Sequence, residues 1–362
     1  MSTSPLKMGK LRILIFNWRD LAHNSAGGAE VYTQRVAKEW VKMGHQVTLF
    51  CSYVEGSPEN ELVDGIRVIR RGGKHSVYRQ AKKYYQNEGV GNFDLVIDEI
   101  NTRPFGTPKW VKDTEVIALI HQVCREVWFY ETPLIIALIG RFVLEPYWLK
   151  KYRNVKTITI SVSSKESLED YGLKDVRYIP IGFDSDTCTS PLEKEENPTV
   201  IFVGRLAGNK RPLHAVEAFK KIKKDYPNAK LWVIGTGRLE LKIRKMNLQG
   251  VEVLGRISNS EKNTRLSKAH VIVVTSVREG WGMVVTEASV VGTKSIGYDV
   301  PGLRDSIRSA NGVLTKPRPK ELANAIKTHF ENLNHQNTQR TKTTGVIAWD
   351  ELSRRILLEA KS

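Results

Sequence analysis

Strand-like and helix-like segments alternate along this chain in two successive runs, and this alternation constrains the fold more than any other feature. In the first run, short β-branched and apolar segments are separated by longer segments with helical periodicity. The predicted strands lie at residues 11–16, 46–51, 66–70, 94–98, 115–120, 157–161 and 176–180, and the predicted helices at 28–43, 76–88, 134–150 and 164–171. Such alternation is typical of a parallel sheet with helices on both faces.

A second run of the same kind begins at residue 199. Its predicted strands lie at 199–204, 231–235, 251–254, 271–275 and 294–298, and its predicted helices at 211–225, 238–246, 260–267, 283–291 and 319–333. A chain of 362 residues is also longer than a single hydrophobic core usually supports. We therefore predict an α/β fold with two Rossmann-like, parallel-sheet domains that face a central cleft.

Polar segments mark the expected domain boundaries. Residues 184–198 contain two prolines and few apolar residues, which indicates a linker. This places the first domain at residues 1–183 and the second at residues 199–342. A last helical pattern at 349–360 lies in the C-terminal segment 343–362, after another polar stretch.

The cysteines and the N-terminal residues predict a cytoplasmic protein. Cys51, Cys124 and Cys188 are far apart and form no C-x-x-C pair, so neither a disulfide framework nor a zinc site is indicated. The apolar run 11–16 is short and contains Arg12, which predicts a first strand and not a signal peptide. No segment has the length of a membrane span.

The formal net charge of +17 would attract anionic partners such as lipid headgroups, nucleotide diphosphates or nucleic acid. The basic residues are dispersed in several clusters, and a solvated helix face explains each cluster equally well. The sequence has no helix-turn-helix and no surface motif of interleaved aromatic and basic residues, so we predict no nucleic-acid partner. A basic nucleic-acid-binding protein stays as the less favoured alternative.

The most apolar segment, residues 133–149, runs directly into Lys150 and Lys151. One interpretation is an amphipathic helix that rests on an anionic membrane, which would make this a peripheral membrane protein. The other is a helix packed on its own sheet, with Arg141 and Glu145 on its outer side. The packed helix is the favoured interpretation for most of the segment.

Residues 271–292 carry the strongest functional signal. A β-branched strand ends in a turn that contains Gly280 and Gly282, and an apolar helix follows. A helix start after an open loop presents free N–H groups and the positive end of the helix dipole, which favours an anion such as a phosphate. Glu279 and Glu287 lie on either side of this helix start. There they would accept hydrogen bonds from the hydroxyls of a sugar and a ribose that flank a diphosphate.

The Glu-x7-Glu spacing with its inner E-G-x-G motif resembles the donor-binding signature of retaining glycosyltransferases with the GT-B fold, and more narrowly of glycosyltransferase family 4. The resemblance extends over nearly the whole chain. It implies that Glu279 contacts the transferred sugar and that Glu287 binds the ribose of a UDP-sugar or GDP-sugar. The residues that it implies for the diphosphate are Gly280, Gly282, Met283 and Val284. In this family the last helix often crosses back onto the first domain.

Two more glycine-containing turns match the family. Gly27 and Gly28 turn the chain from the first strand into a helix, where a ligand can approach main-chain amides. A tight turn without a ligand is the alternative. In the segment F-V-G-R-L-A-G-N-K-R-P, Gly204, Arg205 and Lys210 match residues that hold the donor diphosphate, with a solvated lysine as the alternative for Lys210. Fixed cations there would stabilise the leaving nucleoside diphosphate more in the transition state than in the ground state.

Three further candidates lie at predicted strand ends, which face the ligand crevice of an open parallel sheet. The resemblance implies that His121 contacts the donor sugar near the reaction centre, and a structural histidine is the alternative. Asp98 and Glu99 are adjacent and point to opposite faces, so at most one of them lines the cleft. That residue would bind acceptor hydroxyls or act as a base. A buried cap for the following Asn101 and Thr102 is an equal alternative.

Asp184-Ser185-Asp186 spells the D-x-D motif that holds a divalent metal in glycosyltransferases of another fold. Here it opens the linker, and only Asp184 matches the family. Because cations and a helix start already oppose the diphosphate, we predict neither a metal nor another cofactor. The implied reaction moves a hexose, with retention, to a hydroxyl acceptor, a lipid-linked or other glycan among the candidates. A nucleotide-sugar epimerase of similar fold is the alternative.

Overall fold

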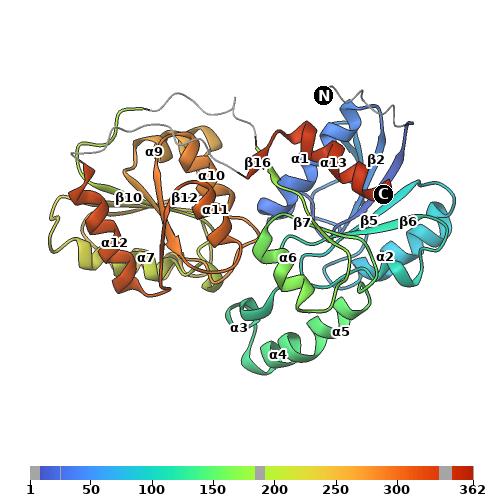
Figure 1. Ribbon diagram of the computed structural model, residues 1–362, viewed down its shortest axis with the longest axis horizontal. Coiled ribbons are helices and arrows are strands. Elements are labelled where there is room, and N and C mark those ends of the chain that lie inside the picture. The colour runs from blue at the N-terminus through green and yellow to red at the C-terminus, as the bar shows by residue number, and fades with distance from the viewer. Residues whose placement is uncertain (1–8, 25, 184–191, 334–344, 362) are drawn as a thin grey trace.

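The computed structural model describes residues 9–24, 26–183, 192–333 and 345–361. These residues form two lobes, each built on a mostly parallel β-sheet with helices on both faces (Figure 1). The predicted α/β architecture with two Rossmann-like domains is therefore confirmed. The D-x-D motif, Cys188 and the first part of the expected linker lie outside the described residues, as does the polar stretch 334–344.

The N-terminal lobe contains, in the described residues, an eight-stranded sheet with the order β3-β4-β2-β1-β5-β6-β7-β8. Its strands are β1 (Arg12–Phe16), β2 (Gln46–Cys51), β3 (Asn60–Val63), β4 (Ile66–Arg70), β5 (Leu95–Glu99), β6 (Glu115–Leu119), β7 (Thr157–Thr159) and β8 (Val176–Tyr178). The strand order reverses at β1, which lies between β2 and β5. In an open parallel sheet, ligands bind at the carboxyl ends of the strands near such a point.

The hairpin strand β3 was not predicted from the sequence. It runs antiparallel to β4, whereas the other strand pairs described in this sheet are parallel. The two strands are joined by Asp64 and Gly65, which have φ angles of 52° and 82°. A two-residue Asp-Gly turn with positive φ at both positions is a strong hairpin signal, so the information was present in the sequence.

Helices cover both faces of this sheet. The helices of this lobe are α1 (Gly28–Lys42), α2 (Val77–Tyr84), α3 (Trp128–Glu131), α4 (Leu134–Ile139), α5 (Glu145–Lys150) and α6 (Val162–Glu169). It also contains the π-helical turns η1 (Tyr85–Gly89) and η4 (Gly140–Leu144) and the 3₁₀ turns η2 (Thr107–Lys109) and η3 (Arg125–Val127). Helix α1 packs on one face through Tyr32, Val36 and Trp40. Helix α2 packs on the other face through Val77 and Ala81. Because α1 directly follows the loop after β1, its N-terminus lies at the carboxyl edge of the sheet.

The C-terminal lobe repeats the architecture with a six-stranded parallel sheet in the order β12-β11-β10-β13-β14-β15. Its strands are β10 (Thr199–Val203), β11 (Lys230–Ile234), β12 (Val251–Gly255), β13 (Val271–Val274), β14 (Lys294–Tyr298) and β15 (Val313–Thr315). Its helices are α7 (Pro212–Ile222), α8 (Glu240–Lys245), α9 (Asn259–Lys268), α10 (Met283–Val290), α11 (Leu303–Ser309) and α12 (Pro319–Glu331). The 3₁₀ turn η6 (Gly208–Lys210) precedes α7. The order reverses between β10 and β13. In this sheet too, a ligand is expected at the carboxyl ends of the strands near the point where their order reverses.

The last helix lies on the N-terminal lobe, as the red ribbon beside α1 in Figure 1 shows. Strand β16 (Val346–Ile347) pairs with β9 (Ile181–Gly182), and α13 (Trp349–Lys361) then packs along α1. The indole Nε1 of Trp40 donates a 2.9 Å hydrogen bond to the Ser353 carbonyl oxygen. Leu352, Ile356 and Leu357 complete the buried contact.

The favoured interpretation of residues 133–149 as a packed helix is wrong for most of the segment. Helices α4 and α5 and the turn η4 form one continuous rod at the outer edge of the molecule, and only its inner side is buried. The rod contains a π-helical turn before Pro146, which has no N–H group to donate to the preceding turn. Among the described residues, no helix is long and apolar enough to cross a membrane.

Trp349 anchors α13, and its removal should loosen the N-terminal lobe. Its ring lies directly on Gly182, where an added Cβ atom would be 2.3 Å from the indole, and edge-on to Tyr32 at 5.8 Å. We expect Trp349→Ala to lower the free energy of unfolding by about 3–5 kcal/mol, because the truncation leaves a cavity. Urea denaturation followed by circular dichroism would measure this change. Leu358→Ala, at a 45% exposed position of the same helix, should leave it nearly unchanged.

Candidate active site

The two lobes touch where the chain leaves β6 and where it leaves β13. Gly280, in the loop after β13, lies against His121: a Cβ atom placed on Gly280 would be 3.1 Å from the His121 carbonyl oxygen and 3.2 Å from its Cβ. Any larger residue would displace the neighbouring chain by a few tenths of an ångström. The structure thus brings together two predicted site residues that come from different lobes.

Glu279 is held in place by its neighbours. Its carboxylate forms an ion pair with the Lys210 ammonium and accepts a 2.5 Å hydrogen bond from the Ser276 hydroxyl. Its backbone N–H donates to the Pro301 carbonyl oxygen at 3.2 Å. A Cβ atom on Gly302, which has a φ of 75°, would lie 1.9 Å from the Glu279 carbonyl oxygen. Because backbone passes this close to backbone, the carboxylate has a fixed position in the cleft.

The turn η6 and the end of β13 hold the backbone of Lys210 in place. The Thr275 hydroxyl lies 2.8 Å from the Lys210 carbonyl oxygen and 2.9 Å from that of Arg211. Arg211 has a left-handed backbone with a φ of 48°, and α7 begins directly after it. In this geometry the Lys210 ammonium meets the Glu279 carboxylate.

Helix α10 begins where the sequence predicted an anion site. Gly282 precedes it with a φ of 88°, and Met283 and Val284 form its first turn, whose N–H groups have no acceptor within the helix. Glu287, in the second turn, forms a 2.7 Å ion pair with Lys262 of α9. The helix start and Glu287 therefore lie on one side of the lobe, with a further cation, Lys262, that the sequence analysis did not single out.

A glycine turn missed by the sequence analysis, residues 235–237, packs directly on Gly204. A Cβ atom on Gly235 would lie 2.0 Å from the Gly204 carbonyl oxygen, and one on Gly237 would lie 2.7 Å from that of Leu206. The G-T-G sequence directly after β11 was the signal for this close approach. Arg205, between the two contacts, is exposed and has no ion-pair partner among the described residues. It is a free cation at the carboxyl edge of the sheet.

His121 is buried and neutral. Burial lowers its pKa to about 4. Its ring lies edge-on to Tyr32 at 4.7 Å, and its Nδ1 is 4.0 Å from the nearer Glu99 carboxylate oxygen. The Ser164 hydroxyl fixes the backbone by donating a 2.8 Å hydrogen bond to the His121 carbonyl oxygen. The other ring nitrogen, Nε2, has no hydrogen-bond partner among the described residues.

Asp98 and Glu99 point to opposite sides of β5, and their partners differ. The Asp98 carboxylate accepts hydrogen bonds from the Phe105 and Thr107 N–H groups, from the Thr107 hydroxyl and from the Tyr152 hydroxyl. With these four hydrogen-bond donors, Asp98 caps the loop at residues 105–107. The sequence analysis expected this cap a few residues earlier, at Asn101 and Thr102. The geometry of Asp98 favours a structural role over acceptor binding.

Glu99 faces α1 and the site. It accepts a 2.5 Å hydrogen bond from the Thr33 hydroxyl through one oxygen, and its other oxygen has no hydrogen-bond partner in the described part of the chain. Burial raises the pKa of Glu99 to about 8, so this carboxyl is protonated near neutral pH. Glu99 and His121 together form a floor of the cleft that carries no full charge.

The glycine turn before α1 is closed by a buried carboxylate. The Gly27 N–H donates a 2.6 Å hydrogen bond to Glu30, which in turn forms a 2.7 Å ion pair with Arg19. The sequence analysis did not single out this pair. An added Cβ atom on Gly28 would meet nothing within 4 Å, so the helix start is open on that side.

A buried arginine joins the lobes beside the site. Arg278, which precedes Glu279, forms a 3.0 Å ion pair with Glu126 and lies 3.2 Å from the Ser167 hydroxyl of the N-terminal lobe. Burial opposes the charge on Glu126, but the neighbouring Arg278 guanidinium lowers the pKa of this carboxyl overall. Sequence patterns gave no sign of this contact, because the two residues are 152 positions apart.

A second group of contacts joins α3 to the loops around Lys210. The Tyr130 hydroxyl accepts a 2.7 Å hydrogen bond from Arg211, and its carbonyl oxygen accepts one from Arg238. The Glu131 carboxylate accepts a 3.4 Å hydrogen bond from the Asn209 N–H. Residues 125–151, named the helical arm below, thus begin in contact with the C-terminal lobe and end in the outer rod.

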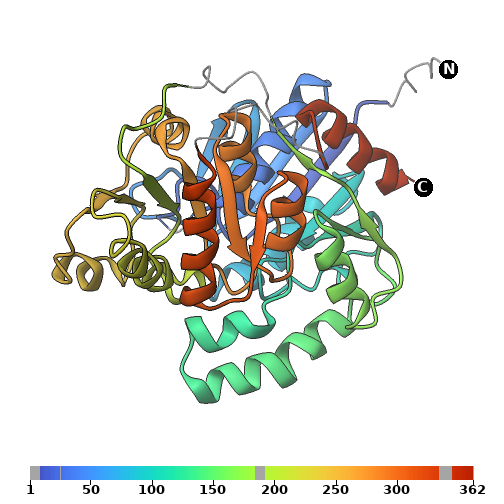
Figure 2. The same cartoon turned by 60° about the vertical axis from the view of Figure 1, so that its left-hand side comes forward.

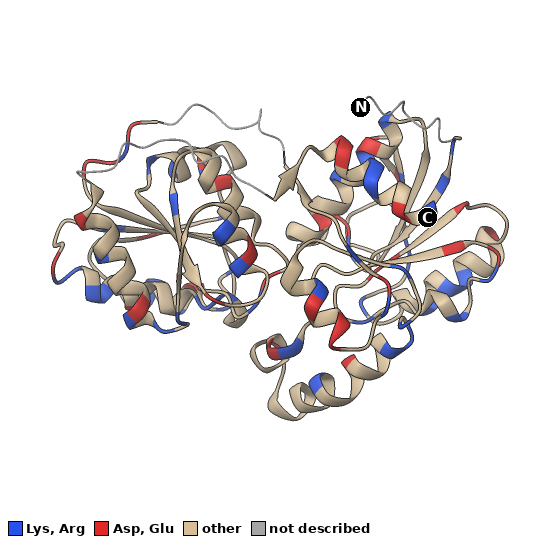
Figure 3. Cartoon of the chain, in the orientation of Figure 1, with Lys and Arg blue, Asp and Glu red and all other residues tan. Residues whose placement is uncertain are grey.

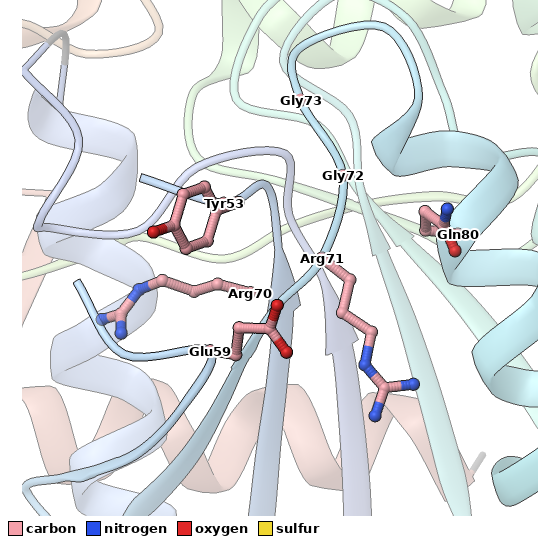
Figure 4. A pocket seen from close by; sticks show the side chains of 7 residues that line it. All are labelled: Tyr53, Glu59, Arg70, Arg71, Gly72, Gly73 and Gln80. Atoms are coloured by element: carbon pink, nitrogen blue, oxygen red, sulfur yellow. The ribbon is translucent and has the colours of Figure 1, made fainter. Parts of the chain in front are cut away.

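A cavity in the N-terminal lobe is lined by none of these site residues. It has a volume of about 440 Å³ and lies at the carboxyl end of β4 (Figure 4). Its lining residues are Tyr53, Glu59, Arg70, Arg71, Gly72, Gly73 and Gln80. Arg70 is already paired with Asp20 at 2.5 Å and Glu61 at 2.7 Å. The cavity therefore lies at the same edge of the sheet as Glu99 and His121, at the end of a different strand.

Solved structures share this two-lobed arrangement. Sucrose-phosphate synthase from Thermosynechococcus elongatus superposes with a TM-score of 0.78 at 20% identity, over 98% of this chain and 100% of that chain. The Anabaena protein HepE, solved in complex with UDP and glucose, superposes with a TM-score of 0.68 at 19% identity, over 97% and 100% of the two chains. The fold is that of the GT-B class of glycosyltransferases.

Sequence comparison identifies the family. The model described as Glycosyltransferase Family 4 matches residues 26–187, and the model described as Glycosyl transferases group 1 matches residues 187–344. The uncharacterized glycosyltransferase MJ1607 of Methanocaldococcus jannaschii is 24% identical over 351 residues, which cover 86% of this chain and 87% of that protein. The chain belongs to glycosyltransferase family 4, so the resemblance noted in the sequence is confirmed.

The raised pKa of Glu99 predicts a pH-dependent stability. Because folding raises this pKa from about 4.5 to about 8, its contribution to stability is fully present below pH 4.5 and is lost as the pH rises through 8. Glu99→Gln should therefore be more stable than the parent protein at pH 9, by a margin that shrinks toward pH 5. Urea denaturation at pH 5, 7 and 9 would test this. Glu166→Gln, at an exposed position of α6, serves as the control, and an equal pH profile for both variants would contradict the expectation.

Proposed function

We propose that this protein is a retaining glycosyltransferase that moves a hexose from a nucleoside diphosphate sugar to a hydroxyl acceptor. The observation that carries the proposal is the pairing of Lys210 with Glu279 beside the start of α10, in the loop that touches His121 of the other lobe. A cation and a helix start suit a diphosphate, and a fixed carboxylate next to them suits the hydroxyls of a sugar.

The donor nucleotide binds the C-terminal lobe in this proposal. The diphosphate lies at the N–H groups of Gly282, Met283 and Val284, between Arg205 and Lys210, and Glu287 accepts hydrogen bonds from the ribose. The free guanidinium of Arg205 supports this placement, because an exposed cation without a carboxylate partner is available to a phosphate. The complex of HepE with UDP and glucose makes a UDP-sugar the first donor to test.

Catalysis in this proposal depends on charge stabilisation and not on a covalent nucleophile. When the glycosidic bond breaks, the diphosphate gains negative charge, and the nearby cations stabilise that charge in the transition state. A donor phosphate oxygen takes the acceptor proton on the same face of the sugar, which retains the anomeric configuration. Because the Lys210 charge already opposes the diphosphate, the proposal includes no metal ion and no other cofactor.

The N-terminal lobe supplies the other wall of the site. His121 is neutral, so its ring can hydrogen-bond a sugar hydroxyl without placing a charge beside the reaction centre. The protonated carboxyl of Glu99 lies behind it and is the better placed of the two strand-end acids for contact with an acceptor. We place the reaction in the cytoplasm, in keeping with the free, buried thiols of Cys51 and Cys124.

A panel of UDP-sugars and GDP-sugars would test the proposal with one preparation. A true donor should raise the melting temperature and should be hydrolysed slowly when no acceptor is present. Addition of an acceptor should then give a glycoside whose anomeric configuration, read by nuclear magnetic resonance, matches that of the donor. Isomerisation of the nucleotide sugar without any transfer would instead support the epimerase, and an inverted product would exclude the retaining reaction.

Loss of the Lys210 ammonium should slow donor turnover strongly. We expect Lys210→Ala to lower kcat by about 10²–10³-fold, because one fixed donor to the developing charge is removed and Glu279 is left unpaired. Steady-state donor hydrolysis or transfer would measure the effect. Lys220→Ala, which removes an exposed lysine from α7, is the matched control and should be unchanged. A turnover of Lys210→Ala close to that of the control would contradict the assigned role.

Neutralising Glu287 should weaken nucleotide binding more than it slows the chemical step. Hydrogen bonds to a charged group contribute about 1.5–3 kcal/mol, so Glu287→Gln should raise the Kd for UDP or GDP by roughly 10-fold or more. Isothermal titration would measure the Kd. Glu240→Gln, which likewise removes a carboxylate from an ion pair, at the surface of α8, is the control. An unchanged Kd for Glu287→Gln would show that the ribose binds elsewhere.

A further inference from the structure

The outer rod of the helical arm exposes a continuous apolar surface. Among the described residues, the large apolar side chains that are exposed in this stretch are Leu134, Ile135, Ile136, Leu138, Ile139, Phe142, Val143 and Tyr147. We name these eight side chains the apolar ridge. They fall within 14 consecutive positions, and Ile135 is 74% exposed. Scattered exposed apolar residues need no explanation, but a contiguous patch marks an interaction site.

The ridge is exposed because the rod is firmly attached by its opposite side. Ala137, Gly140 and Leu149 are buried, and the Trp128 ring lies so close to Gly140 that an added Cβ atom would be 2.5 Å from it. The buried carboxylate of Glu145 accepts hydrogen bonds from the Cys124 and Arg125 N–H groups at 2.5 and 2.9 Å. These contacts fix the orientation of the rod, so the ridge cannot turn inward onto the sheet.

Along the rod and the residues that follow it, the charged side chains are mostly basic. From residue 132 to residue 153, the basic residues are Arg141, Lys150, Lys151 and Arg153, and the one acidic residue is the buried Glu145. Figure 3 shows α4 without charged residues and the rod at the margin of the molecule, and Figure 2 shows the same marginal position after rotation. The Lys151 ammonium lies 3.8 Å above the Tyr147 ring, at the point where the apolar surface gives way to the basic end.

We propose that the apolar ridge docks this protein on the surface of a bilayer that contains anionic lipid. A rod of 17 residues, about 25 Å long, is too short and too basic at its end to cross a membrane, but it suits the interface plane. In that position the apolar side chains enter the acyl boundary, and the lysines and arginines meet the headgroups. A second copy of this chain would bring the same cations together, which disfavours self-association through this surface.

This docking would act close to the proposed site. The arm that bears the ridge also carries Tyr130 and Glu131, whose hydrogen bonds reach Arg211 and Asn209 on either side of Lys210. A docked arm therefore keeps the cleft near the lipid surface, where an amphiphilic hydroxyl acceptor would reach it. This consequence for the acceptor rests on the proposed function, whereas the docking itself does not.

Co-sedimentation of the full chain with lipid vesicles tests the proposal. The parent protein should bind vesicles of phosphatidylcholine with 30 mol% phosphatidylglycerol at least about 10-fold more tightly than vesicles of phosphatidylcholine alone. Ile135→Glu combined with Ile139→Glu should reduce binding to the anionic vesicles at least about 10-fold. Leu241→Glu, at a 71% exposed position of α8 in the other lobe, is the matched control and should bind as the parent does.

The charge of the rod is tested separately. Lys150→Glu combined with Lys151→Glu should also weaken binding to the anionic vesicles, and added salt should do the same.

Two results would overturn the proposal. The first is failure of the parent protein to bind anionic vesicles, and the second is equal binding by the parent and the Ile135→Glu, Ile139→Glu variant. Sedimentation velocity would show whether the ridge instead joins two copies: dimers in the parent and monomers in the variant, without vesicle binding, would assign the surface to self-association. Circular dichroism and urea denaturation of each variant confirm folding. Soluble-donor hydrolysis is measured in parallel, so loss of the proposed activity and loss of docking are distinguished.

Discussion

The geometry of the cleft depends on backbone contacts that only glycine allows. Gly302 lies against the carbonyl of Glu279, and Gly280 lies against His121 of the opposite lobe. Backbone atoms cannot rotate away as a side chain can, so these contacts fix the loop relative to both sheets. The Lys210 ammonium then meets the Glu279 carboxylate at a defined place, and the start of α10 follows within a few residues. The carboxylate for which we propose a role in donor binding is thus positioned by the protein itself, which is the kind of preorganisation that catalysis uses.

The two walls of the cleft differ in charge because they differ in burial. Burial disfavours the charged form of any group, so it raises the pKa of Glu99 and lowers that of His121. Both groups are therefore neutral between these values. The C-terminal wall presents Arg205 in the open and Lys210 at its edge. In the proposed function, these two cations favour binding of the donor diphosphate to the C-terminal lobe.

The helical arm connects surface and site in one piece of chain. Its first residues hold the C-terminal lobe through Glu126 and Tyr130, and its last residues form the rod with the apolar ridge. Glu145 is the link between these parts, because its carboxylate binds the backbone where the arm begins. The rod is therefore joined through Glu145 to a segment that contacts the loops around Lys210. The arm is thus apolar on its outer side and hydrogen-bonded on its inner side.

The sequence by itself determined the two alternating runs, and with them the α/β fold, because strand and helix periodicity are local properties of the chain. It also placed Glu279 and the glycine turns in loops after strands, and Glu287 in the helix that follows, since turn chemistry is local too. It missed β3, although the Asp64-Gly65 turn before β4 is a hairpin signal, and it missed β15, which is too short to show a period. It also missed the G-T-G turn, whose close contact with Gly204 depends on a distant part of the chain. Only the tertiary structure decided that Lys210 pairs with Glu279, that Arg278 reaches Glu126, and that residues 134–147 face outward. Each of these three features depends on which distant segment of the chain packs against the residue or helix concerned. A local pattern of apolar or charged residues does not specify that distant segment.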